Sequence, residues 1–520
     1  MRRVAWLGVA SGAFGFAVFV RALRFGFAYD DAWTIVKNAR LAGPLHPVLR
    51  AILGGTATKL GLPDATRPAM VTSLWIDRHL FGLSPFGYHL HSLLLYALVC
   101  ALATLLLLSL TRSVRSALGG GLFFAAAPLH AEVVAAANYR EDLLASLGVL
   151  AALLLLWWPF PVTSQARREN AASPLGVALA VVSFAVALLS KESAVALILI
   201  AAVIAALRRP DRRWLARHEA SLVALLAVGV AWASWRFGLP PGGDDVPRDT
   251  AAPLMAVVFA TARFEVLAVA EALFPFGWSP EHATAPSASA WWLAGLVALL
   301  AAMGWLARRR VARLPVLGLA IALAAALPTS PLAGPANRHA DRYFFLAILG
   351  GALTWGVVLS RVLGHLHRRI PQGRVGQGRA HWAYGWLPLL GVVPLVLVAQ
   401  NAVAPWKDDA ALWSAAVERA PDSPRAWAAL SRVRRLGGDL DSADEAVDRA
   451  LTLEPTYAPA RLTRIYNRLA RGDVDSARAE IEELRSVGSR LDGLQTAVEC
   501  AEGPPADAQA CITAASQRAE

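Results

Sequence analysis

The sequence predicts an all-α protein that combines a polytopic helical membrane domain with a C-terminal α-solenoid. Of its 520 residues, 56% are hydrophobic and only 17% are charged, whereas soluble domains carry about a quarter of charged residues. The apolar residues gather in blocks of about 17–22, the length of a helix that crosses a bilayer. Residues 410–520 are charged and contain no such block. We expect a membrane domain over 1–405, repeats over 406–490 and capping helices over 491–520.

About eleven apolar blocks are candidate membrane spans. Arg2 and Arg3 precede the first block, which lacks a clear small-residue cleavage site, so we expect a retained span. The alternative is the apolar region of a signal peptide. Residues 254–275 are apolar but contain three charged side chains, so we expect helices that lie on or dip into the outer membrane face. The predicted spans are 4–22, 89–110, 117–137, 143–158, 176–190, 193–207, 220–237, 291–307, 314–328, 343–363 and 383–400.

The basic residues predict the orientation of these spans. Clusters of arginine occupy the connections between alternate blocks, and the positive-inside rule places such connections in the cytoplasm. The N-terminus is then cytoplasmic, and the C-terminal region lies on the other side. This topology explains the formal net charge of +12. We therefore expect the lipid bilayer as a partner and no nucleic acid.

Two adjacent acids lie on the outer side, directly after the first span. They are Asp30 and Asp31, in the segment YDDAWTIVKNARL. A carboxylate there could accept the proton of an acceptor hydroxyl as a general base, and the pair could bind a divalent metal. The alternative is a helix N-cap, a position that aspartate favours.

Two further outer turns combine acids and bases. The segment HAEVVAAANYREDLLA connects two spans, and it forms either an ordinary polar turn or one wall of a ligand site. Lys191 and Glu192 lie between two apolar blocks. Lys191 either extends to the membrane surface or offers a point charge to the phosphate of a lipid. The site candidates in these turns are His130, Glu132, Arg140, Asp142, Lys191 and Glu192.

The segment NRHADRYFFLA begins a later span on the outer side. Arg338 and Arg342 are unexpected there, because the arginine clusters occupy the cytoplasmic connections. An anionic ligand would explain them, since arginine makes bidentate contacts with phosphate. Pairing with Asp341 is the alternative. Tyr343 is a further candidate in this segment.

The C-terminal region repeats at 34 residues, the period of tetratricopeptide (TPR) repeats. Gly438 and Asp439 recur as Gly472 and Asp473. In such repeats, small residues let paired helices pack closely, and each unit buries its face on the next. We expect either a groove for an acceptor polypeptide or protein partner, or a stabilising appendage.

Two cysteines flank a predicted turn, EGPPADAQA, close to the C-terminus. They are Cys500 and Cys511, whereas Cys100 lies in a predicted span. A non-cytoplasmic location would allow Cys500 and Cys511 to form a disulfide across this terminal hairpin.

Together these segments resemble the GT-C superfamily of membrane glycosyltransferases, and within it the TMTC family of transmembrane, TPR-containing O-mannosyltransferase-like proteins. The resemblance rests on the order and spacing of its motifs along nearly the whole chain. It implies a polyprenyl-phosphate sugar as donor, with mannose as one candidate, and a hydroxyl acceptor on a polypeptide or glycan. The motifs are YDDAWTIVKN, RPAMVTSLWIDRHLFGLSPFGYHLHSLLLY, HAEVVAAANYREDLLA, the Lys-Glu pair, ADRYFFLA and WKDDAALW.

The resemblance also implies roles for the residues. Asp30 would be the general base, Asp31 its partner or a metal contact, and Glu132 the second acidic residue. Many relatives have Asp-Glu in place of this Asp-Asp pair, so the roles within the pair stay open, as does the metal, with Mg²⁺ and Mn²⁺ as candidates. The donor phosphate would be bound by basic residues that stabilise the charge left on the departing lipid phosphate; they are Lys191, Arg342, Arg140 and Arg338.

Two other functions compete with this one. The first is a non-catalytic scaffold whose TPR groove recruits a partner in envelope assembly or glycan export. The second is a lipid-linked-oligosaccharide ligase or transporter, which would not need Asp30 as a base. The outer acids and arginines favour the glycosyltransferase, because a scaffold gains nothing from ionisable groups at the membrane. High alanine and arginine usage favours a bacterial inner-membrane protein with a periplasmic site; in a eukaryote the same site would face the ER lumen.

Overall fold

The structure, a computed structural model, describes residues 2–56, 66–157, 174–208, 212–238, 254–282, 289–332, 339–368, 391–486, 494–502 and 511. Within these ranges every regular element is a helix and no strand occurs, which confirms the all-α prediction. The chain divides into two compact units. The first contains Met1–Trp278 and Ser287–Lys407, and the second contains Ser279–Pro286 and Asp408–Glu520. The sequence did not indicate that residues 279–286 belong with the C-terminal unit.

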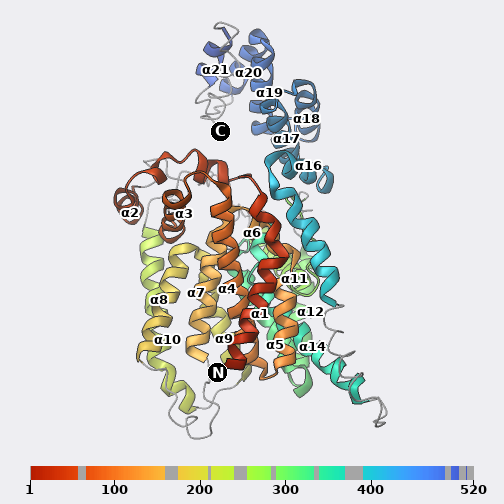
Figure 1. Ribbon diagram of the computed structural model, residues 1–520. Helices are drawn as coiled ribbons and strands as arrows, with labels where there is room; N and C mark the ends of the chain where they lie inside the picture. The colour runs from red at the N-terminus through yellow and green to blue at the C-terminus, as the bar shows by residue number, and fades with distance from the viewer. Residues whose placement is uncertain are drawn as a thin grey trace. The chain divides into compact units, whose positions relative to one another are not determined.

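Long helices that run side by side make up most of the first unit (Figure 1). The pairs with the most extensive packing are α1 with α4, α7 with α8, and α14 with both α5 and α13. Residues 391–403 are also helical. The long helices are α1 (Arg2–Phe19), α4 (Pro85–Thr111), α5 (Val114–Ala125), α7 (Arg140–Trp157), α8 (Pro174–Ser190), α9 (Ala196–Arg208), α10 (Arg212–Gly238), α11 (Leu254–Leu273), α12 (Ala290–Ala307), α13 (Arg313–Ala326) and α14 (Ile348–Arg368).

Six helices in the described part of the chain are long and apolar enough to cross a membrane, so the first unit has the character of a multi-pass membrane domain. The prediction of about eleven spans is not confirmed. Helix α8 and the segment Glu192–Leu207 are apolar but shorter, α7 begins with three charged residues, and residues 383–390 of one predicted span lie outside the described ranges. The six candidates are Ala5–Arg24, Pro85–Thr111, Ser221–Gly238, Ala290–Ala307, Arg310–Thr329 and Ile348–His365.

The predicted span 117–137 is broken in the structure. Helix α5 ends at Ala125, and the chain bends by 51° before Pro128–Ala135. Proline favours such a break, because it has no N–H to donate to the preceding helical turn. The chain then forms three short helices, η5 (Pro128–His130), α6 (Ala131–Ala135) and η6 (Ala137–Tyr139). This irregular segment carries Glu132 and lies at the centre of the site described below.

Close packing of α5 on α14 places this segment beside the start of α14. A Cβ on Gly120 would lie 2.4 Å from the carbonyl oxygen of Ala352, and one on Gly356 would lie 2.2 Å from that of Ser116. Only glycine allows the two backbones to approach so closely. As a result η10 (Asp341–Phe344), which precedes α14, contacts both η5 and α6.

The predicted first outer loop packs around a small apolar core. It follows η1 (Val20–Arg24) and contains η2 (Ala32–Val36), η3 (Ala39–Ala42), α2 (Leu45–Leu53) and α3 (Pro68–Phe81). Ile35, Leu41, Ile52 and Met70 are buried together in this core. The loop is therefore a folded layer and can present Asp30 and Asp31 in a fixed position.

Residues 254–275, for which helices on or dipping into the outer membrane face were expected, contain one continuous helix, α11. Helix α11 packs along α12, α13 and α14. Its buried residues include Phe264, Ala268 and Ala272. The three charged side chains prevented the sequence from indicating this packing.

The second unit is a series of helices with equivalent contacts at equivalent positions. Gly438 and Gly472 end helices with φ values of +83° and +79°, which glycine adopts without strain. Asp439 and Asp473 each accept a hydrogen bond at 3.2 Å from the N–H three residues later. That these helices form TPR repeats stays a prediction. They are α16 (Asp409–Arg419), α17 (Pro424–Leu436), α18 (Leu440–Leu453), α19 (Ala458–Arg471), α20 (Val474–Ser486) and α21 (Leu494–Glu502).

The sulfur atoms of Cys500 and Cys511 are bonded in the structure. Cys500 belongs to the buried core that α19, α20 and α21 share. Residues 503–510, which hold most of the predicted turn, lie outside the described ranges.

Candidate functional site

Asp30 lies on the outer loop, partly exposed, and its carboxylate contacts a tyrosine from a distant segment. The hydroxyl of Tyr139 donates a hydrogen bond to Asp30 Oδ2 at 2.9 Å. The main-chain carbonyl of Asp30 accepts the N–H groups of Trp33 and Thr34, which begins η2. Asp30 is therefore oriented by both its backbone and its side chain, while part of the carboxylate stays accessible.

Asp31, by contrast, is fully buried. Its Oδ1 accepts the N–H of Asn138 at 2.7 Å, and its Oδ2 accepts the N–H of Ala137 at 3.2 Å. Burial raises the pKa of Asp31 from 3.8 to about 7, although these two N–H donors lower it in part. The side chain connects the first loop to the segment that carries Tyr139. Asp31 thus fixes the relative position of the two segments that meet at Asp30.

Glu132 and Arg342 form a pair beside Tyr139. Glu132 Oε2 accepts the main-chain N–H of Arg342 at 3.0 Å, and the guanidinium of Arg342 contacts Oε1. The guanidinium carbon lies 4.3 Å from the centre of the Tyr139 ring, within cation–π distance. Asp30, Tyr139, Arg342 and Glu132 therefore form one continuous chain of contacts.

A second charged cluster surrounds Lys191. Its Nζ lies 2.6 Å from Asp142 Oδ2 and 3.0 Å from Glu141 Oε1. Arg67 contacts the same Glu141 and lies 2.9 Å from Glu192 Oε1. Burial by itself would lower the pKa of Lys191, but the two facing carboxylates outweigh it and the pKa lies above its ordinary value. The lysine is therefore a buried, charged side chain that is already paired.

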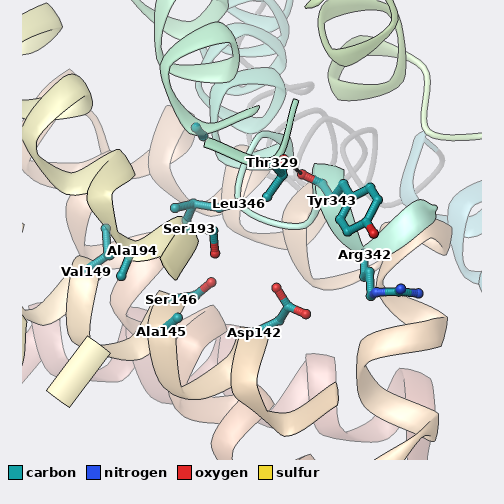
Figure 2. Close-up of a pocket in the computed structure, with 11 residues that line it drawn as sticks. Asp142, Ala145, Ser146, Val149, Ser193, Ala194, Thr329, Arg342, Tyr343 and Leu346 are labelled. Atoms are coloured by element: carbon teal, nitrogen blue, oxygen red, sulfur yellow. Dashed lines mark hydrogen bonds between the residues drawn. The ribbon is translucent and has the colours of Figure 1, made fainter. Parts of the chain in front are cut away.

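A small cavity lies between the two clusters (Figure 2). Asp142 from the lysine cluster and Arg342 from the Asp30 side both line it. Its volume is about 20 Å³, which is enough for roughly one water molecule. A phosphate or a sugar would need its walls to move apart. The lining residues are Asp142, Ala145, Ser146, Val149, Ser193, Ala194, Ala325, Thr329, Arg342, Tyr343 and Leu346.

Arg140 lies away from this cavity. Its side chain is completely buried and lies 2.5 Å from Asp77 Oδ2. It also donates to the hydroxyls of Ser73 and Ser92 and to the carbonyl of Tyr88. These contacts connect α3, α4 and α7, and Arg140 does not line the cavity.

The remaining candidates have different locations. His130 is buried, with Nδ1 at 3.0 Å from the Tyr96 hydroxyl and Nε2 at 3.2 Å from the carbonyl of Phe345. Tyr343 lines the cavity, and Glu192 contacts Arg67. Arg338 lies outside the described residues.

Three residues of this arrangement were not among the sequence candidates. They are Tyr139, Arg67 and Glu141, and all three lie inside the motifs named above. Arg67 had a recognisable signal, because it is another arginine on the outer side. No sequence signal could have identified Tyr139, because its contact with Asp30 joins positions that are 109 residues apart in the sequence.

The chain has relatives among proteins of known function. No protein-family model matches the chain, and no solved structure matches it. Protein O-mannosyl-transferase Tmtc2 of Drosophila melanogaster is 30% identical over 234 residues, which are 44% of this chain and 24% of that protein.

Two further relatives match shorter segments. Protein O-mannosyl-transferase Tmtc1 of Drosophila melanogaster is 33% identical over 145 residues, 27% of this chain and 17% of that protein. Protein O-mannosyl-transferase TMTC2 of Homo sapiens is 33% identical over 149 residues, 28% of this chain and 18% of that protein. The matches thus span less than a quarter of each of these three relatives. The chain is similar to the TMTC protein O-mannosyltransferases, as its motifs predicted.

Proposed function

We propose that this chain is a membrane glycosyltransferase that moves a sugar, with mannose as the first candidate, from a polyprenyl phosphate to a hydroxyl group. The acceptor would be a polypeptide or glycan on the non-cytoplasmic face. The observation that carries the proposal is the contact chain from Asp30 through Tyr139 and Arg342 to Glu132. It joins a partly exposed carboxylate to an arginine across three distant segments. The similarity to protein O-mannosyltransferases supports the same chemistry.

In the proposed reaction Asp30 is the general base. The acceptor oxygen attacks the anomeric carbon, the bond from that carbon to the phosphate oxygen breaks, and the acceptor proton passes to Asp30. A single displacement of this kind inverts the anomeric centre. The hydrogen bond from the Tyr139 hydroxyl to Oδ2 orients the Asp30 carboxylate, and a general base must be oriented in this way to reach the acceptor proton.

Arg342 is the proposed contact for the departing phosphate. Arg342 is one of the residues that line the cavity, and its guanidinium lies over the Tyr139 ring, so a phosphate bound by this guanidinium would lie close to the base. Lys191 and Arg67 would add positive charge on the other side of the cavity, and Arg338 stays a candidate from the sequence. Because Lys191 and Arg342 already contact carboxylates, a phosphate must replace or join these partners.

We propose supporting roles for Arg140 and Asp31. Arg140 is fully enclosed by Asp77, Ser73, Ser92 and Tyr88, which favours a structural role over contact with the donor. Both carboxylate oxygens of Asp31 accept main-chain N–H groups. Adjacent Asp30 and Asp31 therefore do not fit a shared Mg²⁺ or Mn²⁺ ion, which needs free carboxylate oxygens.

The second unit and the location complete the proposal. We propose that its helices are TPR repeats that bind the acceptor polypeptide or a partner protein. The disulfide between Cys500 and Cys511 suits an oxidising compartment and therefore supports the non-cytoplasmic side. In a bacterium this side is the periplasm, which we propose from the composition.

The test is transfer by the purified chain in proteoliposomes. Radiolabelled polyprenyl-phosphate mannose, glucose and galactose are offered with membrane polypeptides as acceptors. We expect Asp30→Asn to lower transfer at least about a hundredfold, because it removes the general base. The matched control is Asp448→Asn, an exposed aspartate in α18, which should leave transfer unchanged.

Two outcomes would point to the alternatives. A scaffold would keep its function after Asp30→Asn and lose it after changes in the second unit. A ligase or transporter would move lipid-linked oligosaccharide equally well with Asn at position 30. Undiminished transfer by Asp30→Asn would rule out the catalytic role assigned to Asp30.

A further inference from the structure

Tyr29, the residue directly before Asp30, packs with two further aromatic rings. The ring centres of Tyr29 and Tyr139 are 6.2 Å apart, those of Tyr29 and Trp406 6.3 Å, and those of Tyr139 and Trp406 6.4 Å. Trp406 meets both tyrosines edge to face, at 88° and 79°, an arrangement that aromatic pairs favour. Tyr139 and Trp406 are buried. We call this group the aromatic triangle; its members come from three segments far apart in the sequence.

The backbone of Tyr29 is in an unfavourable conformation. Its φ of +58° lies in the left-handed region, where a side chain with a Cβ crowds the following carbonyl. Such a residue keeps this conformation only where its surroundings impose it. The contacts of the Tyr29 ring with Tyr139 and Trp406 supply that constraint.

The direction of Asp30 depends on this conformation. The left-handed residue turns the chain immediately before Asp30, whose carbonyl then accepts the N–H groups of Trp33 and Thr34 at 3.1 Å. The turn directs the Asp30 carboxylate to the Tyr139 hydroxyl. If Tyr29 relaxed to a negative φ, the carboxylate would leave this position.

Trp406 lies in a different segment from the residues proposed to take part in the reaction. It belongs to η11 (Ala404–Lys407), the last helix of the first unit. The carbonyl of Lys407 accepts the N–H of Gly26 at 3.0 Å, which attaches η11 to the first loop. Trp406 does not line the cavity, and its ring contacts with Tyr29 and Tyr139 connect it to Asp30.

We propose that Trp406 is a positioning residue for Asp30: with Tyr139 it keeps Tyr29 left-handed and so fixes the orientation of the Asp30 carboxylate. The inference rests on the proposed function for its catalytic consequence. Its structural consequence, an ordered Tyr29–Val36 backbone, does not depend on that function.

The first experiment measures structure without any substrate. Hydrogen–deuterium exchange of peptides covering residues 29–36 is compared in the full-length wild type and in variants in proteoliposomes. Trp406→Ala should speed this exchange at least about tenfold, since local opening sets the exchange rate, while Trp406→Phe should stay within about twofold. Trp355→Ala, which removes a tryptophan that stacks with Phe123 on the other side of α14, should leave this peptide unchanged. Unchanged exchange in Trp406→Ala would overturn the inference.

The second experiment measures transfer with the donor sugar that the wild type uses. Trp406→Ala should lower kcat by up to about a hundredfold, because misplacing a reacting group by 1 Å can have an effect of this size. The KM for the donor should change less than about threefold, and Trp406→Phe should restore most of kcat. A rise in KM with unchanged kcat would contradict a positioning role.

A double-mutant cycle separates the triangle from general destabilisation. Tyr29→Gly removes the ring and adopts a positive φ without strain. In that background Trp406→Ala should change the exchange of residues 29–36 less than about twofold, because its partner ring is gone. Additive effects would overturn the inference.

The exchange and transfer experiments can fail independently of each other. If exchange responds as expected while Asp30→Asn still transfers sugar, the proposed function fails and the structural role of Trp406 stands.

Discussion

Arg342 binds Glu132 through two separate groups. Its main-chain N–H donates to Oε2 at 3.0 Å and its guanidinium contacts Oε1. Glu132 therefore fixes both the backbone of η10 and the direction of the arginine side chain. The same guanidinium lies over the Tyr139 ring, whose hydroxyl binds Asp30. The distance between the proposed base and the proposed phosphate contact is thus set by one buried carboxylate.

Arg342 should be sensitive to geometry as well as to charge. We expect Arg342→Ala to lower kcat at least about a hundredfold, through loss of electrostatic stabilisation of the leaving phosphate. Arg342→Lys should lower it about tenfold, because lysine keeps the charge but lacks the planar guanidinium. The control is Arg361→Lys, an exposed arginine of α14, with no expected effect. Wild-type kcat in Arg342→Ala would remove Arg342 from the mechanism.

Lys191 should contribute to stability and activity in separable ways. Lys191→Met leaves the buried carboxylate of Asp142 without its ion-pair partner, while Glu141 keeps its contact with Arg67. The loss should destabilise the protein by about 3–5 kcal/mol. The variant Lys191→Met with Asp142→Asn should recover part of this loss. Thermal unfolding in detergent measures the stability of the single and of the double variant. If Lys191 also contacts the donor phosphate, the double variant should regain stability without regaining transfer; recovery of both would make Lys191 purely structural.

The buried pair of Arg140 and Asp77 should affect stability only, and not the binding of the donor. Arg140→Ala leaves Asp77 buried without its cation and should lower stability by about 3–5 kcal/mol. Replacing the pair by Arg140→Met with Asp77→Leu should restore stability, since buried ion pairs can be exchanged for apolar residues at little net change. Donor KM in the double variant should equal that of the wild type. A KM raised tenfold or more in the stable double variant would instead indicate that Arg140 contacts the donor.

Asp31 should make stability depend on pH. Burial raises the pKa of Asp31 from 3.8 to about 7. At a pH between these two values, Asp31 is protonated in the folded protein and ionised in the unfolded chain. The resulting stabilisation is complete below about pH 4 and is lost as the pH rises through about 7, with a magnitude on the order of a few kcal/mol. The Tm of the wild type should therefore fall relative to that of Asp31→Asn between pH 5 and pH 8. A constant difference between the two Tm values would contradict this assignment.

Much of the fold could be predicted from local sequence patterns. The apolar blocks predicted helices because crossing a bilayer needs about 20 apolar residues, and α4 and α12 fulfil this simply. The break after Ala125 was not predicted, because apolar residues continue past Pro128 on both sides of His130 and Glu132 and so extend the apparent span. Helical structure was expected around α11, but its packing inside the first unit was not, since Glu265 and Arg263 resemble surface residues, whereas Glu265 is buried.

The candidate site was predictable by residue type but not by role. Arg140 and Arg342 have the same chemistry and similar outer positions in the sequence. Only tertiary packing distinguishes them, because Arg140 meets Asp77 inside the protein and Arg342 lines the cavity. Asp30 and Asp31 are adjacent, yet one carboxylate is partly exposed and the other is buried against main-chain N–H groups. That difference depends on the packing of the segment that carries Ala137 and Asn138 against Asp31, which no local pattern indicates.

The measurement that tests the account most directly is the sidedness of the site. Single cysteines replace Lys37, Glu192 and Arg115 in a chain from which the native cysteines have been removed. A membrane-impermeant maleimide is then applied to intact cells or right-side-out vesicles. We predict that Lys37→Cys and Glu192→Cys react from the non-cytoplasmic side and that Arg115→Cys reacts only after permeabilisation. Reaction of the positions 37 and 192 from opposite sides, or of both only from the cytoplasm, would contradict a single non-cytoplasmic site.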